Sequence, residues 1–500
     1  MDIKTALETY KRIQKTLSAY GFATTAVHYD AETVAPEGGA KERNEAMEIL
    51  SNITYEIETS SEMLEAVEYL ASHKDELDEK MRREITEYQR QSEYIKSIPQ
   101  EEYVAFSVLL HEAASVWKRA KNENDYASFA PYLQKIFDTN KKFALYYKPE
   151  NDPYDTLLDS YERGLTREKC DAFFGKLRES IVPLVHKIGE KQQIENGFVF
   201  RSYPHHLQEK FSDFLMEKMA IDRNFCTIGE TEHPFTLNFN KHDVRITTHY
   251  YENDLLNSLY SVVHEGGHAL YELGSGDEYE GTGLSGGASM AMHETISRFY
   301  ENIIGRSETF TSLIYPELCK LFPESFKDVT EEMLYLAANR SEPSLIRTES
   351  DDLTYSLHVM IRYEIERGMI SGEYKAEELP AVWNEKYKHY LGVDVPDDSR
   401  GVLQDSHWSG GAVGYFPSYA LGSAYGAQIY NTMKKEFDVD AAIREAGNLS
   451  PINKWLEEHI FRHGCMYDSD VLLKNTTGEE FNPSYYTEYL EEKYTRIYSL

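Results

Sequence analysis

Two histidines four residues apart, with a glutamate directly after the first, have the clearest chemical potential in this sequence. His264, Glu265 and His268 form the pattern His-Glu-x-x-His within residues 255–270, a segment with the apolar period of a helix. Residues four apart on a helix share a face, so both imidazoles can reach one cation. Glu265 then lies beside that cation and can take a proton from a bound water, whose pKa zinc lowers to about 7. The pattern predicts a hydrolytic zinc site; two histidines packed by chance in one helix are the alternative.

The neighbouring glycines and a downstream glutamate support the zinc-site interpretation. Gly266 and Gly267 stand inside the predicted helix, where each costs about 1 kcal/mol relative to alanine. We therefore expect another segment to approach this backbone closely. Catalytic zinc sites usually have three protein ligands and leave one position for water. Glu294, on a helix predicted from about residue 287, is the candidate third ligand, and a solvated surface glutamate is the alternative.

The elements around these residues are predicted to be mainly helices. Apolar residues recur every three or four positions through the first 150 residues, where we expect Gly21 to end the first helix and residues 36–39 to form a turn. Residues 235–239 and 244–247 alternate instead, with the polar residues 240–243 between them. The fold class is therefore mainly α, with a small antiparallel β-sheet beside the zinc helix. No linker divides residues 1–500 into separate domains.

Composition narrows the class of protein. The net charge of −33 argues against a nucleic-acid partner, because phosphates require a basic surface. The four cysteines are scattered and form no Cys-x-x-Cys pair, which disfavours both a disulfide framework and a thiolate metal site. No signal-peptide pattern and no apolar run of about 18 residues occur. We expect a soluble cytoplasmic protein without membrane contact.

Beyond these patterns, six motifs occur in order along nearly the whole sequence, and weaker ones occur at residues 33–43 and 154–164. The six are His233-Pro234-Phe235, Asp243-Val244-Arg245-Ile246-Thr247, His264-Glu265-Gly266-Gly267-His268, His293-Glu294-Thr295-Ile296-Ser297-Arg298, Ile346-Arg347-Thr348-Glu349-Ser350-Asp351, and Gly401-Val402-Leu403-Gln404-Asp405-Ser406-His407-Trp408, which runs on into Gly414-Tyr415-Phe416-Pro417. With these motifs the sequence resembles the carboxypeptidase Taq family of zinc metallocarboxypeptidases.

The sequence departs from the family pattern at four positions. Ser350 replaces a usual alanine, Ile296 a common glutamine, Tyr29 a tryptophan and Gly283 a proline. None of these changes removes a ligand or the base. We expect Ile296 to alter a hydrogen bond near Glu294 and thereby the affinity for the metal.

The resemblance implies that His264, His268 and Glu294 are the metal ligands and that Glu265 is the general base and then the general acid. Attack on a peptide carbonyl creates an oxyanion, which a neutral donor can stabilise together with the metal. His407 is the candidate donor. A histidine buried beside Trp408, with both ring nitrogens satisfied, is the alternative.

A carboxypeptidase must also bind the free C-terminal carboxylate of its substrate. Arg347 is the candidate, because its planar guanidinium can bind a carboxylate through two hydrogen bonds, with Tyr415 as a helper. The alternative is a salt bridge to Glu349 or Asp351. We expect Arg245 to hold the wall of the substrate groove, with Asp243 bracing the hairpin. Residues 414–430 form either a mobile wall or packed core.

The resulting hypothesis is a metal-dependent carboxypeptidase that removes single residues from peptide C-termini, using zinc with cobalt as a possible substitute. A zinc oligopeptidase or aminopeptidase and an inactive peptide-binding homologue are the alternatives. The resemblance also implies a groove-shaped helical protein and a homodimer, and we expect the helices of about residues 1–150 to form one wall of the groove.

Overall fold

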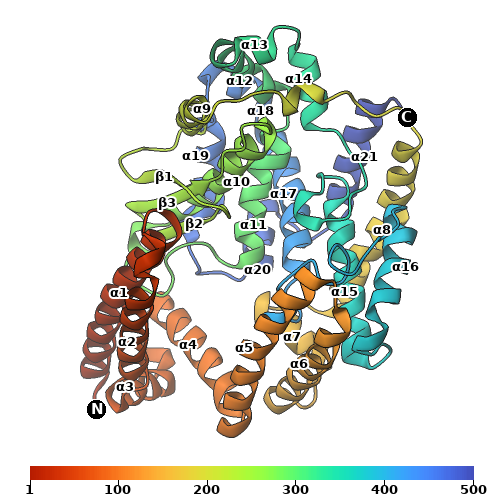
Figure 1. Cartoon of the computed structure of the whole chain (residues 1–500). Helices are drawn as coiled ribbons and strands as arrows, with labels where there is room; N and C mark the ends of the chain where they lie inside the picture. Colours follow the sequence, from red (N-terminus) through yellow and green to blue (C-terminus); the bar gives the residue numbers. More distant parts are fainter.

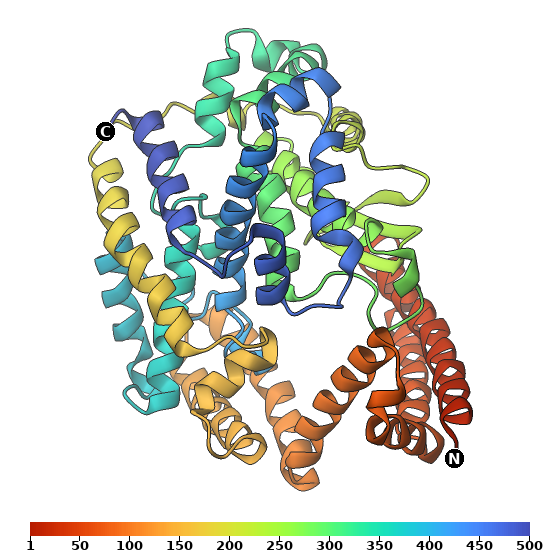
Figure 2. The same ribbon diagram turned by 180° about the vertical axis from the view of Figure 1, so that it is seen from behind.

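The computed structural model of the chain describes all 500 residues, and helices dominate it (Figures 1 and 2). The N-terminal third contains α1 Ile3–Thr33, α2 Ala40–Glu58, α3 Ser61–Ser72, α4 Glu79–Ser97, α5 Gln100–Glu123 and α6 Tyr126–Tyr147. The middle contains α7 Pro153–Tyr161, α8 Arg167–Gly189, α9 His205–Lys218, β1 Cys226–Glu230, β2 Thr236–Asn240, β3 Asp243–Thr248, α10 Leu255–Leu273, α11 Met290–Arg298, α12 Glu308–Leu321, α13 Pro323–Phe326 and α14 Glu331–Ala338. The C-terminal part contains α15 Tyr355–Ser371, α16 Leu379–Leu391, α17 Pro417–Glu436, α18 Val439–Ala446, α19 Ser450–His459, α20 Ser469–Thr477 and α21 Ser484–Tyr498.

The first helix is longer than its sequence indicates. The expectation that Gly21 ends it is wrong, because α1 continues to Thr33. Gly21 does not adopt the left-handed conformation that usually ends a helix, and the contacts of α1 with α2, α3 and the sheet outweigh the low helix propensity of one glycine. The expected turn follows at Glu37–Gly39 as a short 3₁₀ helix.

The small sheet is mixed rather than wholly antiparallel. The predicted hairpin is present, with β2 antiparallel to β3 and Asn240 opposite Asp243. The third strand, β1, was not predicted, and it pairs in parallel with the other edge of β3. The chain leaves β1, forms β2 on the far side and returns as β3 between them. Val244 and Ile246 of this central strand are fully buried, and β3 packs against α10.

Besides a cluster of three buried residues, two hydrophobic cores of very different size hold the helices together. One contains 99 buried residues and includes side chains from α10, α11, α15 and α17. The other contains only nine and lies among α1, α3, α4 and the segment before α4, at the lower left of Figure 1. Helices α1, α3 and α4 therefore form a small bundle with its own core, whereas α5 and α6 contribute to the large core.

The residues of the predicted metal site stand on two adjacent helices of the large core. In Figure 1, α11 lies between α10 and α17. The glycine prediction is confirmed, since a Cβ on Gly267 would lie 2.8 Å from the Cα of Ser297 in α11. On the other side, a Cβ on Gly422 of α17 would lie 2.8 Å from the Cβ of Glu294. Residues 417–429 are mostly buried in α17, which favours packed core for this stretch.

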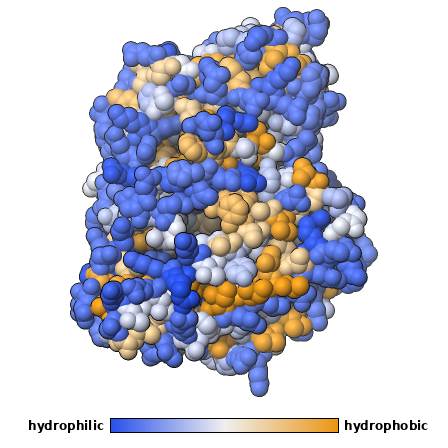
Figure 3. All heavy atoms as spheres, turned by 90° about the vertical axis from the view of Figure 1, so that its left-hand side faces the viewer, coloured by the Kyte–Doolittle hydropathy of each residue, from blue (hydrophilic) through white to orange (hydrophobic).

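One face of the molecule is seen to be mainly hydrophilic (Figure 3). Figure 3 shows the face at the left of Figure 1, where blue residues predominate and a hollow opens near the middle. None of the helices combines the length and the apolar composition needed to cross a membrane.

Candidate active site

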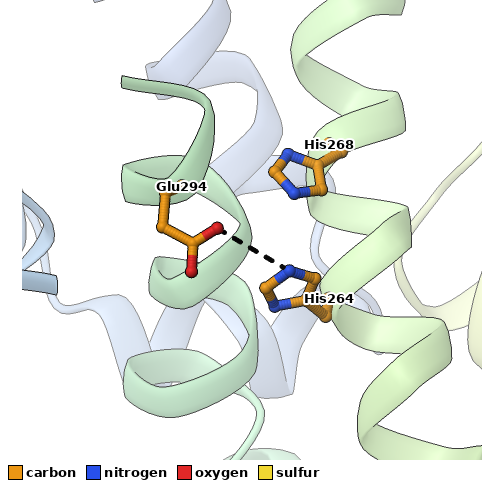
Figure 4. A group of neighbouring side chains, drawn as sticks. All are labelled: His264, His268 and Glu294. Carbon is orange, nitrogen blue, oxygen red and sulfur yellow. Dashed lines mark ion pairs between the residues drawn. The ribbon is translucent and has the colours of Figure 1, made fainter. Parts of the chain in front are cut away.

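His264, His268 and Glu294 converge in the space between α10 and α11 (Figure 4). The side chain of Asp254 caps α10 by accepting from the backbone N–H of Asn257, and Ser289 caps α11 in the same way. One ligand atom from each of the three residues lies within 4.8 Å of the others. His264 Nε2 is 3.9 Å from Glu294 Oε2, a gap that one cation at about 2.0–2.2 Å from each atom spans.

The two histidines are prepared to bind a metal. His264 Nδ1 contacts Glu301 Oε2 at 2.9 Å, which leaves Nε2 free to face the cation, as in many carboxylate–histidine–metal arrangements. His268 Nδ1 is buried without a hydrogen-bond partner. Burial, together with the nearby His264, His293 and Arg298, holds the pKa of His268 well below its usual value. The ring is therefore neutral, as a metal ligand must be, and two imidazoles with one carboxylate fit a divalent cation such as zinc.

Glu294 has a fixed orientation. Its Oε1 accepts from Arg298 Nε at 2.7 Å, and the guanidinium of Arg298 stacks on the ring of Tyr355 at 3.8 Å. Ile296 is fully buried in the large core. The hydrogen bond to Glu294 thus comes from Arg298, one turn further along α11, and does not require a glutamine at position 296.

Glu265 lies beside the three candidate ligands and is held by the sheet. Its side chain is buried, and Thr236 Oγ1 of β2 donates to Glu265 Oε2 at 2.6 Å. Burial raises the pKa of Glu265 above its usual value, although His264 and Thr236 oppose this effect. A carboxylate with a raised pKa is suited to accept a proton and to return it in a later step.

Two acidic residues to which the sequence interpretation assigned no role lie next to this site. Glu301 lies in a π-helix, Phe299–Ile304, that continues α11, and Arg306 Nη2 donates to its Oε1 at 3.1 Å. Its position seven residues after Glu294, about two helical turns, was a usable signal. Glu272 Oε1 contacts His293 Nε2 at 2.8 Å, so this carboxylate holds the imidazole of His293, whose ring centroid lies 5.4 Å from that of His268.

Arg347 has a different partner from those expected. Its Nε and Nη2 donate to Asp405 Oδ1 at 3.1 and 2.9 Å, and its Nη1 donates to the hydroxyl of Tyr355 at 3.1 Å. The proposed salt bridge to Glu349 or Asp351 is wrong. Asp351 instead accepts from the backbone N–H groups of Leu353 and Thr354, just before α15, because its side chain points back into that turn. The Ser350 hydroxyl donates to the carbonyl oxygen of Arg347 at 2.6 Å.

His407 and Tyr415 lie against each other in the loop before α17. Their rings stack with centroids 5.7 Å apart, and His407 Nε2 is 3.1 Å from the hydroxyl of Tyr419. Burial lowers the pKa of His407 to about 4, so its imidazole is neutral at pH 7. The other ring nitrogen, Nδ1, is buried without a partner. The alternative in which both nitrogens are satisfied by the protein is therefore wrong.

Arg245 braces the sheet. Its Nε and Nη2 donate to the two carboxylate oxygens of Asp243 at 2.9 and 2.8 Å. Its guanidinium lies 4.1 Å from the ring centroid of Phe239 and 5.2 Å from that of Tyr29. These contacts join β3, β2 and α1, and they fit a role in a wall better than direct contact with the substrate terminus.

Comparison with known proteins gives the same family as the motifs. The family model described as carboxypeptidase Taq (M32) metallopeptidase matches residues 9–494. Carboxypeptidase 1 of Bacillus subtilis is 38% identical, with both chains covered completely, and thermostable carboxypeptidase 1 of Pyrococcus furiosus is 36% identical over 98% of each chain.

Solved structures agree with this assignment. An M32 carboxypeptidase from Deinococcus radiodurans superposes with a TM-score of 0.95 at 31% identity, over 99% of this chain and 100% of the other. A Pyrococcus furiosus carboxypeptidase structure gives 0.92 at 36% identity, over 98% of both chains. The fold, the full-length identity and the family match agree. This chain belongs to the carboxypeptidase Taq family and is a metallocarboxypeptidase.

Proposed function

We propose that this metallocarboxypeptidase removes single residues from the free C-termini of peptides at a cation held by His264, His268 and Glu294. The observation that carries the proposal is the convergence of these three side chains beside Glu265, which Thr236 orients. Each turnover cleaves one peptide bond, consumes one water and releases one amino acid and a shortened peptide.

The cation, Glu265 and His407 have separate roles in this hydrolysis. A bound divalent cation supplies a Lewis acid that polarises the scissile carbonyl and lowers the pKa of a water. Glu265 takes the proton of the attacking water and returns it to the leaving nitrogen. His407, neutral at pH 7, donates a hydrogen bond to the oxyanion as it develops.

The C-terminal residue of the substrate must also be recognised. Arg347 is our proposed contact for the terminal carboxylate, through N–H groups that Asp405 and Tyr355 leave free, with the hydroxyl of Tyr415 as a helper. The ion pair with Asp405 fixes the plane of the guanidinium. Arg245, held by Asp243, stabilises the wall formed by the sheet.

Several wider properties belong to the same proposal. The two-imidazole, one-carboxylate donor set supports zinc as the native cation and cobalt as a substitute. We propose one catalytic domain, residues 1–500, in which the helices of about residues 1–150 form one wall of the groove. The family resemblance supports a homodimer. A cytoplasmic location stays a prediction.

The substitution Glu265→Gln tests the proposal, because it removes the base and leaves the ligands. We expect zinc to bind with a stoichiometry of about one, while turnover of a peptide with a blocked N-terminus falls about 10²-fold or more. Mass spectrometry of the peptide digested by the wild-type enzyme should show loss of residues from the C-terminus only. The matched control is Glu48→Gln on the exposed surface of α2, which should be fully active. Normal turnover by Glu265→Gln, or cleavage from the blocked end, would exclude the mechanism.

A further inference from the structure

Helix α7 carries a buried polar side chain at each end, and neither has a role in the mechanism above. Tyr154 stands in its first turn and Glu162 directly follows its last residue. Their exposed fractions are 1% and 3%. They lie within the weak motif of residues 154–164, about 12 Å apart along the helix axis. Burial of a carboxyl group is costly, so its retention calls for a specific partner.

Glu162 contacts the start of the helix that carries Glu294. Its Oε1 accepts from the backbone N–H of Ala291 at 2.7 Å, in the first turn of α11. Its Oε2 accepts from the Ser469 hydroxyl at 3.2 Å, and that hydroxyl lies 2.6 Å from the hydroxyl of Ser289, the residue that caps α11. The first N–H groups of a helix lack intrahelical acceptors, so this carboxyl satisfies one of them from outside. Glu294 follows three residues after Ala291.

Tyr154 contacts the loop of His407 and Tyr415 through one intermediate. Its hydroxyl donates to Glu366 Oε2 at 2.8 Å. Glu366 is fully buried and also accepts from Trp408 Nε1 at 2.7 Å and from the backbone N–H of Gly414 at 2.9 Å. In the sequence, Trp408 directly follows His407 and Gly414 directly precedes Tyr415. Burial raises the pKa of both Glu162 and Glu366 to about 7.

The body of α7 also touches this loop directly. Gly414 has a φ of +94°, and a Cβ there would lie 2.9 Å from the carbonyl carbon of Leu157. The ring of Tyr161 meets that of Tyr415 edge-on, with centroids 5.1 Å apart. The helix itself is anchored from outside, since Asp159 Oδ2 is 2.9 Å from Arg90 Nη2 of α4 and 2.8 Å from Lys148 Nζ.

We propose that α7 is a positioning strut that sets the place of Glu294 relative to the loop of His407 and Tyr415. Glu162 fixes α11 at one end, and the pair Tyr154–Glu366 fixes the loop at the other. The inference rests on the proposed function, because in that function the cation held by Glu294 and the donor His407 must act together on the scissile carbonyl. Neither Glu162 nor Tyr154 is a catalytic residue.

The two ends of the strut predict different defects. In Glu162→Ala, α11 loses its anchor, and the zinc dissociation constant, measured by competition with a chelator, should rise about 10- to 100-fold. Glu162→Gln keeps an acceptor for the Ala291 N–H and should restore zinc affinity to within a few-fold of the wild type. Tyr154→Phe should leave zinc affinity unchanged and, at saturating zinc, lower kcat/KM about 10-fold, because the loop shifts against the substrate.

A matched control separates positioning from stability. Tyr203 is also fully buried, and its hydroxyl donates to the carbonyl oxygen of Phe198 at 2.6 Å, within a segment that the mechanism does not use. Tyr203→Phe should lower Tm with no change in zinc affinity or kcat/KM. If Glu162→Ala does not fold, Glu162→Asp, whose carboxyl is one methylene shorter, should give an intermediate loss of zinc affinity.

Two results would overturn the strut. One is a wild-type zinc affinity in Glu162→Ala, or in Glu162→Asp where the alanine variant does not fold. The other is a wild-type kcat/KM in Tyr154→Phe at saturating zinc. Zinc affinity is measured without turnover, so it tests the strut even if the proposed hydrolysis is wrong. The activity of Glu265→Gln tests only the proposed hydrolysis.

Discussion

At the scale of single residues, the ion pair between Arg347 and Asp405 defines how this arginine can act. Its side chain is only 7% exposed, and Asp405 also pairs with Arg362. The two guanidinium groups hold the pKa of Asp405 well below its usual value. Loss of Arg347 would therefore leave Asp405 with one charged partner, which limits the cost of an unpaired buried charge.

This arrangement makes Arg347→Ala an informative variant. We expect KM for free-acid peptides to rise about 10- to 100-fold more than KM for the C-terminal amides, because about 1.5–3 kcal/mol of charge-assisted hydrogen bonding is lost only with the acid. Arg347→Lys keeps the charge without the planar fork and should be intermediate. Arg201→Ala, at an exposed pair with Asp328, is the control for loss of a cation. An equal rise for acids and amides would contradict carboxylate binding by Arg347.

The sequence indicated the three residues that now converge because the helical period is a local property. His264 and His268 share a face of α10 whatever surrounds it. The partners of these residues depend on contacts between distant segments, and no spacing predicts them. Asp405 reaches Arg347 across 58 positions, and Thr236 reaches Glu265 across 29. Glu301 was accessible from sequence, but only by extending the α11 periodicity two turns past Glu294.

At the scale of elements, the distance between α10 and α11 depends on one glycine. A Cβ on Gly267 would lie 2.8 Å from backbone Cα of Ser297, so Gly267→Ala must push the two helices apart. We expect a loss of about 1–3 kcal/mol in the free energy of unfolding and weaker zinc binding, since the ligands stand on both helices. Gly21→Ala in α1 is the matched control, because nothing lies within 4 Å of its Cβ. It should gain about 0.5–1 kcal/mol. Denaturant titration measures the free energy of unfolding of both variants, and competition with a chelator measures their zinc affinity. A Gly267→Ala variant that is more stable than the wild type would contradict the close packing.

The strand order shows the limit of prediction at the same scale. The alternation in residues 235–247 predicted the hairpin, because two strands that are joined by a short polar turn pair in an antiparallel way. The same pattern carries no information about a third strand. β1 pairs with β3 although β2 lies between them in the sequence, and the central strand β3 packs against α10.

At the scale of the whole molecule, the two cores predict unequal stability. The nine-residue core of α1, α3 and α4 buries far less apolar surface than the core of 99 residues around the site. Local opening should therefore cost less free energy in the N-terminal bundle than in α10, α11 and α17. This difference would let the bundle of α1, α3 and α4, which is one part of the proposed wall, move while α10 and α11 stay fixed.

Native-state hydrogen exchange measures this difference directly. Amides of α1 and α3 should exchange faster than those of α10, α11 and α17. Zinc at about 100 times its dissociation constant should add about 2.7 kcal/mol of protection to amides that exchange only when the site unfolds. Amides of the N-terminal bundle should gain little, because the bundle opens while the site stays intact. Apo protein prepared with a chelator is the reference. Equal protection in both regions and an equal gain with zinc would show that the 500 residues unfold as a single unit, and the bundle would then not be an independently moving wall.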